Sequence, residues 1–177
     1  MIPSPILHRQ GTLDGLCGVY CVVNACTMLL GSSVFTPSEM FKVLVRSLGK
    51  KIGWHISNGM FHTELESVLQ CCVAYMRSQD VDLSFHRAFT EAPKSLNTFW
   101  ATLQQHHRRC GDGSIILGLD GKHSHWTCVD TMDNKCIRLA DSDHLTELFR
   151  DTITIGRATV ARPTIIEAPM TYLLSLK

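Results

Sequence analysis

The spacing of apolar residues changes once along this chain, near Gly113, and that change restricts the folds open to it. Before Gly113, apolar side chains recur every three or four residues, as at Met40 and Leu44, which is the spacing of a helix with one buried face. After it, the segments 114–119 and 125–131 have the β-rich or alternating character of strands. Helices followed by an antiparallel sheet indicate the α+β class, with the helices packed against the sheet.

The whole chain, residues 1–177, is expected to form a single domain. One domain usually takes about 100–200 residues. Of these 177 residues, 45% are hydrophobic, which is enough for a core. No internal repeat and no low-complexity linker divides the sequence.

Within that domain, the pattern predicts helices at 17–30, at 36–48, from Asn58 or Thr63 to Met76, and from Ser95 to Arg109. Lys50–His55 is expected to be a loop, and Asp80–Phe85 a short edge strand. Short β-rich pieces are expected towards the C-terminus, at 152–155, 158–161, 164–167 and 171–174.

The stretch from Arg9 to Ala25 holds the first candidate functional residue. Its first half carries the turn formers Gly11 and Asp14-Gly15, and its second half is apolar, so Cys17 is expected where a loop becomes a helix. A thiol at a helix start faces main-chain N–H groups and the positive end of the helix dipole, which stabilise its anion. This is a favourable position for a nucleophile.

The alternative is that Cys17 is a small core residue. The chain has eight cysteines, and cysteine is among the most often buried residue types. A catalytic thiol needs a histidine and an orienting acid or amide as neighbours in space. The presence of such partners decides between the two interpretations.

The candidate partners lie in a predicted hairpin. Ser124–Thr131 and Lys135–Asp141 have the composition of strands, and Met132–Asn134 that of a turn. Counting outward from a three-residue turn places His125 directly opposite Asp141, with the two side chains on one face. The Asp141 carboxylate would then accept the Nδ1–H of the imidazole and leave Nε2 to deprotonate the thiol.

Two nearby residues compete for these roles. His123 lies two residues before His125, so the two side chains would share a face. Gly121 and Lys122 have the character of a turn, and the apolar strand begins only after Ser124, which favours His125 as the anchored histidine. Asp143 lies beyond the end of the strand and is expected to be out of reach of the ring.

In order and type, these residues resemble those of the papain-like cysteine peptidases. The chain has a glutamine, then Cys17-Gly18 opening a helix, then a distant histidine before an apolar strand, then Asp141 at the end of the next strand. The likeness is greatest to the small bacterial branch that includes the bacteriocin-leader peptidases. By this resemblance Gln10 is the oxyanion-hole donor, Cys17 the nucleophile, His125 the base and Asp141 the orienting acid. Gln10 lies seven residues before Cys17, one more than is usual in the family.

The resemblance implies a papain-like fold, with N-terminal helices packed against a C-terminal antiparallel β-sheet. It also implies a cysteine hydrolase that cleaves a peptide or amide bond of a peptide or protein substrate through a thioester. The same triad serves glutamine deamidation and transglutaminase-like acyl transfer, so these chemistries stay open. Two further alternatives are a non-catalytic binding module that kept the fold, and a redox or metal protein that uses the other cysteines.

Composition restricts the partners and the compartment. A formal net charge of +1 gives no reason to expect nucleic acid or an anionic membrane as a partner. No apolar run has the length of a signal peptide or of a membrane span, so no membrane insertion is expected. Eight cysteines without such a signal favour reduced thiols and a cytoplasmic protein. The resemblance implies that the protein is bacterial. No Cys-x-x-Cys spacing occurs, so neither a metal nor another cofactor is expected.

Overall fold

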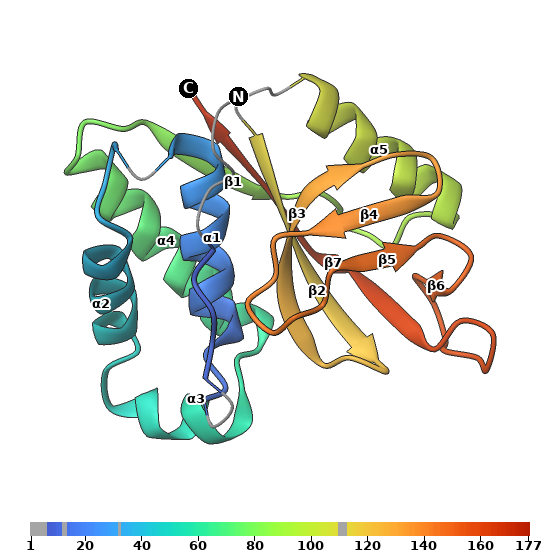
Figure 1. Cartoon of the computed structure of the whole chain (residues 1–177), viewed down its shortest axis with the longest axis horizontal. Helices are drawn as coiled ribbons and strands as arrows, with labels where there is room; N and C mark the ends of the chain where they lie inside the picture. Colours follow the sequence, from blue (N-terminus) through green and yellow to red (C-terminus); the bar gives the residue numbers. More distant parts are fainter. Residues whose placement is uncertain (1–6, 12–13, 32, 110–112) are drawn as a thin grey trace.

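The computed structural model describes residues 7–11, 14–31, 33–109 and 113–177. The helices are α1 (Cys17–Leu30), α2 (Pro37–Ser47), the 3-10 helix η1 (Gly49–Lys51), α3 (Ile52–Asn58), α4 (His62–Arg77) and α5 (Leu96–Arg109). The strands are β1 (Leu83–Arg87), β2 (Gly113–Gly121), β3 (His125–Met132), β4 (Cys136–Leu139), β5 (Glu147–Phe149), β6 (Ile153–Thr154) and β7 (Thr164–Leu176). Helices α1 to α4 precede the sheet, and the chain has the α+β layout that its patterning predicts (Figure 1).

The strands form one mixed sheet in the order β1-β7-β2-β3-β4-β5. Neighbouring strands in this order are antiparallel, and the short β6 pairs in parallel with β7. β7 runs continuously through the two pieces expected at 164–167 and 171–174, and residues 158–161 are not a strand. The expected edge strand is confirmed in β1, which lies at one end of the sheet.

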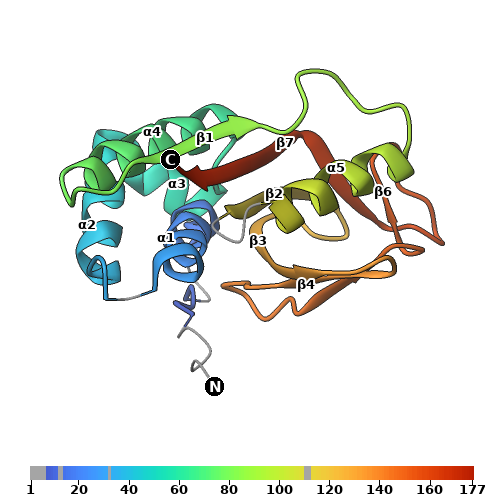
Figure 2. The same cartoon turned by 90° about the horizontal axis from the view of Figure 1, so that it is seen from above.

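The sheet divides the interior into two hydrophobic cores, because successive residues of a strand point to opposite faces. Helices α1, α2 and α4 cover one face, and α5 covers the other (Figures 1 and 2). On β2, Ile116 belongs to the first core, whereas Ile115 and Leu117 belong to the second. Trp126 is buried in the first core and Trp100 in the second.

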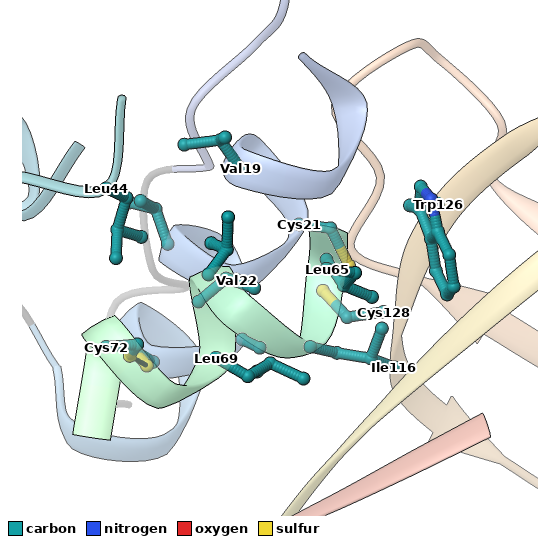
Figure 3. Close-up of a cluster of buried hydrophobic side chains, with 14 of the residues drawn as sticks. Val19, Cys21, Val22, Leu44, Leu65, Leu69, Cys72, Ile116, Trp126 and Cys128 are labelled. Carbon is teal, nitrogen blue, oxygen red and sulfur yellow. Dashed lines mark hydrogen bonds between the residues drawn. The ribbon is translucent and has the colours of Figure 1, made fainter. Parts of the chain in front are cut away.

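Helix α1 is almost entirely enclosed within the first core. Val19, Val22 and Ala25 are each fully buried, and α1 packs against β2, β3, α2 and α4 (Figure 3). A central helix fixed on several sides is a rigid support for whatever its first residue carries. The prediction of a helix over residues 17–30 is confirmed.

The expected loop at Lys50–His55 is wrong. Residues 49–51 form η1 and residues 52–58 form α3, which ends at Gly59. His55 is buried, and its Nδ1 lies 3.1 Å from the carbonyl oxygen of Gly59. This contact closes the short helix, and the sequence pattern does not reveal it.

None of the helices in the described ranges combines the length and apolar character needed to cross a membrane.

Candidate active site

Cys17 is the first residue of α1, so its thiol lies where helical N–H groups have no acceptor within the helix. The loop before it is held by Asp14, whose carboxylate accepts hydrogen bonds from the main-chain N–H of Gly11 (2.9 Å) and of Leu16 (3.2 Å). Gly15 donates its N–H to the carbonyl of Ile56 at 2.7 Å. A Cβ at Gly15 would lie 2.6 Å from the carbonyl oxygen of His55, so only glycine fits against α3 there. These contacts fix the place where the helix begins.

His125 is the first residue of β3 and faces Cys17 from the other half of the molecule; the two side chains line the same pocket. The imidazole Nε2 lies 2.8 Å from Oδ2 of Asp141, and the two side chains are only 12% and 2% exposed. The structure therefore brings together three of the four residues that the sequence singles out: Cys17, His125 and Asp141.

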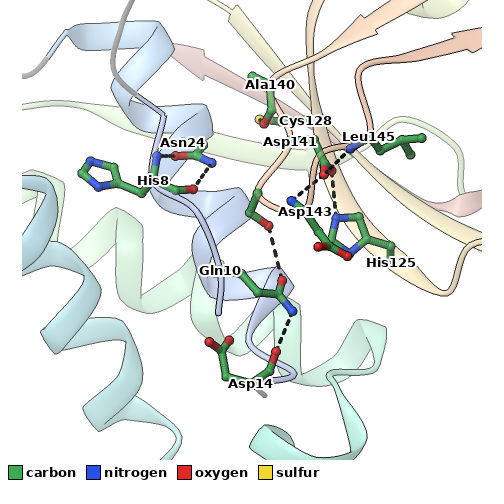
Figure 4. Close-up of polar contacts among 11 residues, drawn as sticks. His8, Gln10, Asp14, Asn24, His125, Cys128, Ala140, Asp141, Asp143 and Leu145 are labelled. Carbon is green, nitrogen blue, oxygen red and sulfur yellow. Dashed lines mark hydrogen bonds and ion pairs between the residues drawn. The ribbon is translucent and has the colours of Figure 1, made fainter. Parts of the chain in front are cut away.

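The Asp141 carboxylate is held by main-chain groups as well as by the ring. Its Oδ1 accepts hydrogen bonds from the N–H groups of Asp143 (2.6 Å) and Leu145 (3.1 Å), and Oδ2 faces His125 (Figure 4). With one oxygen on the main chain and the other on the imidazole, the carboxylate is fixed in orientation. Asp143 contributes its N–H rather than its side chain to this arrangement.

The ring is turned the other way from the expectation. Nε2, not Nδ1, faces the carboxylate, which leaves Nδ1 as the nitrogen that can serve the thiol. Asp141 is the second residue after the end of β4 at Leu139, so it lies outside the ladder of β3 and β4 instead of directly across from His125.

The predicted register of the hairpin is also wrong. Met132 pairs with Ile137, Thr131 with Arg138 and Val129 with Leu139, with a bulge between the last two pairs. Counting outward from Val129 and Leu139 would set Asp143, not Asp141, opposite His125. The ladder ends at Leu139, and the contact between His125 and Asp141 is made by the loop that follows β4.

The cause of the altered register lies in the turn. Asp133 Oδ1 accepts hydrogen bonds from the N–H groups of Lys135 (2.6 Å) and Cys136 (2.9 Å). The N–H of Asp133 in turn donates to the carbonyl of Cys136 at 2.9 Å. Residues 133–135 thus form the turn between β3 and β4, one residue later than the three-residue turn expected at 132–134. The aspartate side chain holds this turn by imitating a main-chain acceptor.

Electrostatics favour a charged histidine in this site. Burial lowers the pKa of His125, but its hydrogen bonds and charge interactions with Asp141 and Cys17 outweigh burial and raise the pKa to about 10. Burial raises the pKa of Asp141, but the hydrogen bond and the charge of His125 outweigh it, and the net change is downward. An imidazolium paired with a carboxylate on one side can stabilise a thiolate on the other.

Among the other cysteines, Cys21 and Cys72 are poorly placed to react. Burial, followed by the interaction with Cys128, raises the pKa of Cys21. A hydrogen bond with Cys26, followed by burial, raises the pKa of Cys72. Both side chains lie within the first core (Figure 3). Cys17 differs from them in lining a pocket beside a histidine.

Cys17 and His125 open onto a cavity of about 280 Å³. One wall comes from the connection between α3 and α4, residues 58–61, and the other from β2 and β7. Trp126 forms part of the floor and donates its indole N–H to the carbonyl of Met60 at 2.8 Å. A Cβ at Gly118 would lie 3.0 Å from the Trp126 ring, so this glycine lets the indole lie flat against β2.

Gln10 joins two loops and is not among the residues that line the pocket of Cys17 and His125. Its Nε2 donates to the carbonyl of Asp14 at 2.5 Å, and its Oε1 accepts from the Ser142 hydroxyl at 3.4 Å (Figure 4). Its main-chain N–H also donates to the carbonyl of Ser142, at 3.1 Å. Gln10 therefore connects the loop before Cys17 to the loop that carries Asp141, and one Nε2 hydrogen is not used in these contacts.

His123 does not share the catalytic pocket. It lines a second cavity, of about 370 Å³, on the other side of His125, together with Asp143, His144 and Leu145. Burial, helped by the charges of Lys122 and His125, lowers the pKa of His123. No group of three metal-ligating side chains gathers anywhere in the described ranges, this cavity included.

The sequence interpretation missed most of the residues that shape the site. These are Asn24 and Ser142, which bind the N-terminal segment and Gln10, and the pocket residues Asn58, Gly59, Met60, Phe61, Gly118, Asp120, Glu167 and Met170. They come from five separate segments, which no local motif relates. The sequence marks these segments only as β-rich, which predicts strands but not which strands are neighbours.

No model of a known protein family and no curated protein matches this sequence. The function therefore has to be argued from the geometry of Cys17, His125 and Asp141 and from the pocket that they share.

Proposed function

We propose that this chain is a papain-like cysteine hydrolase that cleaves a peptide or amide bond. The observation that carries the proposal is the placement of Cys17 at the start of α1, in one pocket with a histidine whose far nitrogen is held by Asp141. Cys17 comes from a helix, His125 from strand β3 and Asp141 from the loop after β4, and this convergence of a helix and a sheet supports a papain-like cleft.

In this mechanism the Cys17 thiolate attacks the carbonyl carbon of the substrate, and the carbonyl oxygen becomes an oxyanion. The N–H of Cys17 in the first turn of α1 and the second Nε2 hydrogen of Gln10 stabilise that oxyanion. The His125 imidazolium gives its proton to the leaving amine, and the C–N bond breaks to leave a thioester.

Hydrolysis of the thioester completes the cycle. Neutral His125 takes a proton from water, the hydroxide attacks the thioester carbonyl, and the C–S bond breaks to release the acid and restore the thiolate. Asp141 holds the ring in one orientation and stabilises its charged form in both steps. The charged state of His125 below its raised pKa suits the first step, in which it acts as an acid.

The test is alkylation by iodoacetamide near pH 6, where ordinary thiols are almost fully protonated. We expect one fast-reacting residue, mapped by mass spectrometry to Cys17, and loss of this fast phase in His125→Ala. Cys136→Ala is the control, because Cys136 is half-buried on β4 and its pKa is raised by burial and by the charge of Glu147. Fast labelling at another cysteine in place of Cys17 would contradict the proposal.

The products formed from a peptide mixture then show which of the reactions that share this triad takes place. New amino and carboxyl termini indicate proteolysis, ammonia release from glutamine side chains indicates deamidation, and incorporation of an added amine indicates acyl transfer. We expect the first, and expect it to disappear in Cys17→Ala. Fast labelling of Cys17 without turnover of any amide would support the binding module instead.

A further inference from the structure

Two carboxylates lie on the sheet wall of the catalytic pocket. On β2, Leu117 and Leu119 point into the second core, so Asp120 lies on the opposite face, the face of the pocket. On β7, Ile166 and Ala168 point into the second core, so Glu167 lies on that same face.

The pairing of β2 with β7 makes these two acids neighbours. Asp120 pairs with Ile165, and Glu167 is two residues further along β7. In a regular ladder such diagonal residues are about 7–8 Å apart. Glu167 begins the irregular stretch between the Ile166 and Thr171 pairs, and both acids line the same pocket. The two carboxylates therefore bracket one part of the pocket beside the catalytic groups.

No cation within the described part of the chain neutralises them. The ion pairs there join Lys42 to Glu39, Arg87 to Glu66 and His125 to Asp141, and involve neither Asp120 nor Glu167. The pocket is lined by neither lysine nor arginine, and its one basic residue, His125, is already paired. Neither carboxylate is therefore offset by a lysine or arginine that lines the pocket.

The opposite wall also suits a cation. Phe61 lines the pocket and is 59% exposed, and Trp54 lies next to it with the ring centroids 5.8 Å apart. Large aromatic side chains left in solvent at the edge of a cavity offer their faces to a ligand. An aromatic face attracts the guanidinium of arginine or the ammonium of lysine.

We propose that this pocket binds the cationic side chain of a peptide substrate, an arginine or lysine next to the bond that Cys17 attacks, between the Phe61 wall and the carboxylates of Asp120 and Glu167. That the bound peptide is a substrate rests on the proposed function, whereas the preference for a cationic ligand follows from the pocket alone. Carboxylates and aromatic rings recognise the charge and the apolar stem of such a side chain together.

The first test measures the preference without any turnover. Two methanethiosulfonates of similar size, the cationic 2-aminoethyl and the anionic 2-sulfonatoethyl reagent, react with Cys17, and mass spectrometry of the Cys17 peptide gives each rate. The ratio of rates is divided by the same ratio for free 2-mercaptoethanol. We expect a normalised ratio of about ten or more in the native protein, because two carboxylates act across a partly desolvated pocket.

The variants make this measurement decisive. Asp120→Asn with Glu167→Gln is expected to bring the normalised ratio close to one. The matched control, Asp130→Asn with Asp151→Asn, removes two exposed carboxylates that do not line the pocket, and should leave the ratio unchanged. A native ratio near one, or a high ratio that survives the pocket substitutions, would overturn the proposal.

The second test uses peptides that differ only by arginine or citrulline at a single position near the cleaved bond. We expect kcat/KM to favour arginine by about tenfold at one such position, and Glu167→Lys to abolish that preference. Equal cleavage of the two peptides at every position would refute the cationic subsite. If no amide is cleaved while Cys17 keeps its reagent preference, the hydrolase is wrong and the cation-binding pocket stands.

Discussion

Asn24, in the middle of α1, binds the main chain of His8 with both ends of its amide. Its Oδ1 accepts the His8 N–H at 2.8 Å and its Nδ2 donates to the His8 carbonyl at 3.0 Å (Figure 4). Asn24 is fully buried, so the two hydrogen bonds replace solvent for both partners. This pair fixes the segment that carries Gln10 along the side of α1 and thereby against the loop of Asp141.

Replacing Asn24 should therefore loosen the site from a distance. We expect Asn24→Asp to lower the free energy of unfolding by about 1–3 kcal/mol, because a carboxylate cannot donate to the His8 carbonyl and is buried without a counter-charge. Urea denaturation measures this loss. Gln70→Glu, at an exposed position on α4, is the control and should change stability by less than about 0.5 kcal/mol. Equal losses in the two variants would mean that the His8 contact contributes little.

Asp141 should tolerate replacement by asparagine poorly. Both carboxylate oxygens accept hydrogen bonds, one from two main-chain N–H groups and the other from the ring, and an amide has only one acceptor oxygen. We expect Asp141→Asn to lower kcat/KM by about two to four orders of magnitude, and Asp141→Ala by at least as much. Asp143→Ala keeps its main-chain N–H, so its kcat/KM should fall only slightly. A nearly active Asp141→Asn would show that one acceptor is enough.

The raised pKa of His125 gives a defined pH dependence. Its pKa is about 10 in the folded protein, above the value of about 6.5 for an unfolded chain. Its contribution to stability is therefore complete below pH 6.5 or so and declines as the pH rises towards 10. The stability difference between native protein and His125→Gln should shrink over this interval.

The thiol accounts for part of this shift, which a second measurement can isolate. In Cys17→Ala the interaction with the thiol is gone, so the pKa of His125 should be lower than in the native protein. Histidine ring signals followed by NMR as a function of pH give both values. An unchanged pKa in Cys17→Ala would mean that Asp141 alone raises it.

Gln10 offers two separable effects. If Gln10 is an oxyanion donor, Gln10→Ala should lower kcat by about a hundredfold, while iodoacetamide labelling of Cys17 stays fast. If Gln10 is also a bridge between the loops, Gln10→Ala should lower stability as well. Ser142→Ala removes only the hydroxyl contact to Oε1, so it should lower stability without the large loss of kcat. If both variants lose kcat equally, positioning of the loops and not the oxyanion explains the loss.

Trp126 connects the floor of the pocket to its aromatic wall. Trp126→Phe keeps an aromatic ring but removes the indole N–H and leaves the Met60 carbonyl without its donor. We expect a loss of about 1–3 kcal/mol in stability and a higher KM, because residues 58–61 form that wall. Trp100→Phe, which removes the indole bond to the Asp133 carbonyl in the second core, should lose stability without raising KM.

The sequence was informative wherever local chemistry decides the structure. The start of α1 at Cys17 follows from the turn formers before it and the unbroken apolar run after it, and both signals are local. The register of the hairpin was not predictable from composition, because it depends on the side chain of Asp133 binding two main-chain N–H groups. The contact between His125 and Asp141 is present although the register that predicted it is wrong, since Asp141 lies in the loop after β4 and not in the ladder.

Other features depend on contacts between distant segments. β7 continues through Pro169, a residue that normally ends a strand, because Pro169 lies exposed at the irregularity in its pairing with β2. Asp120 and Glu167 are far apart in sequence and meet only when β2 pairs with β7. A pattern of alternation predicts which face each acid occupies, but the partner strand has to be known before they form one pocket.

The sheet that separates the two cores also distributes the intrinsic fluorescence of the protein. The chain has three tryptophans. Trp126 reports on the first core and the floor of the pocket, Trp100 on the second core, and Trp54, which is 47% exposed, on the aromatic rim. Three variants that each keep a single tryptophan would show fluorescence from three distinct environments. Each half of the molecule thus carries its own optical probe, and the order in which the halves loosen can be followed without an added dye.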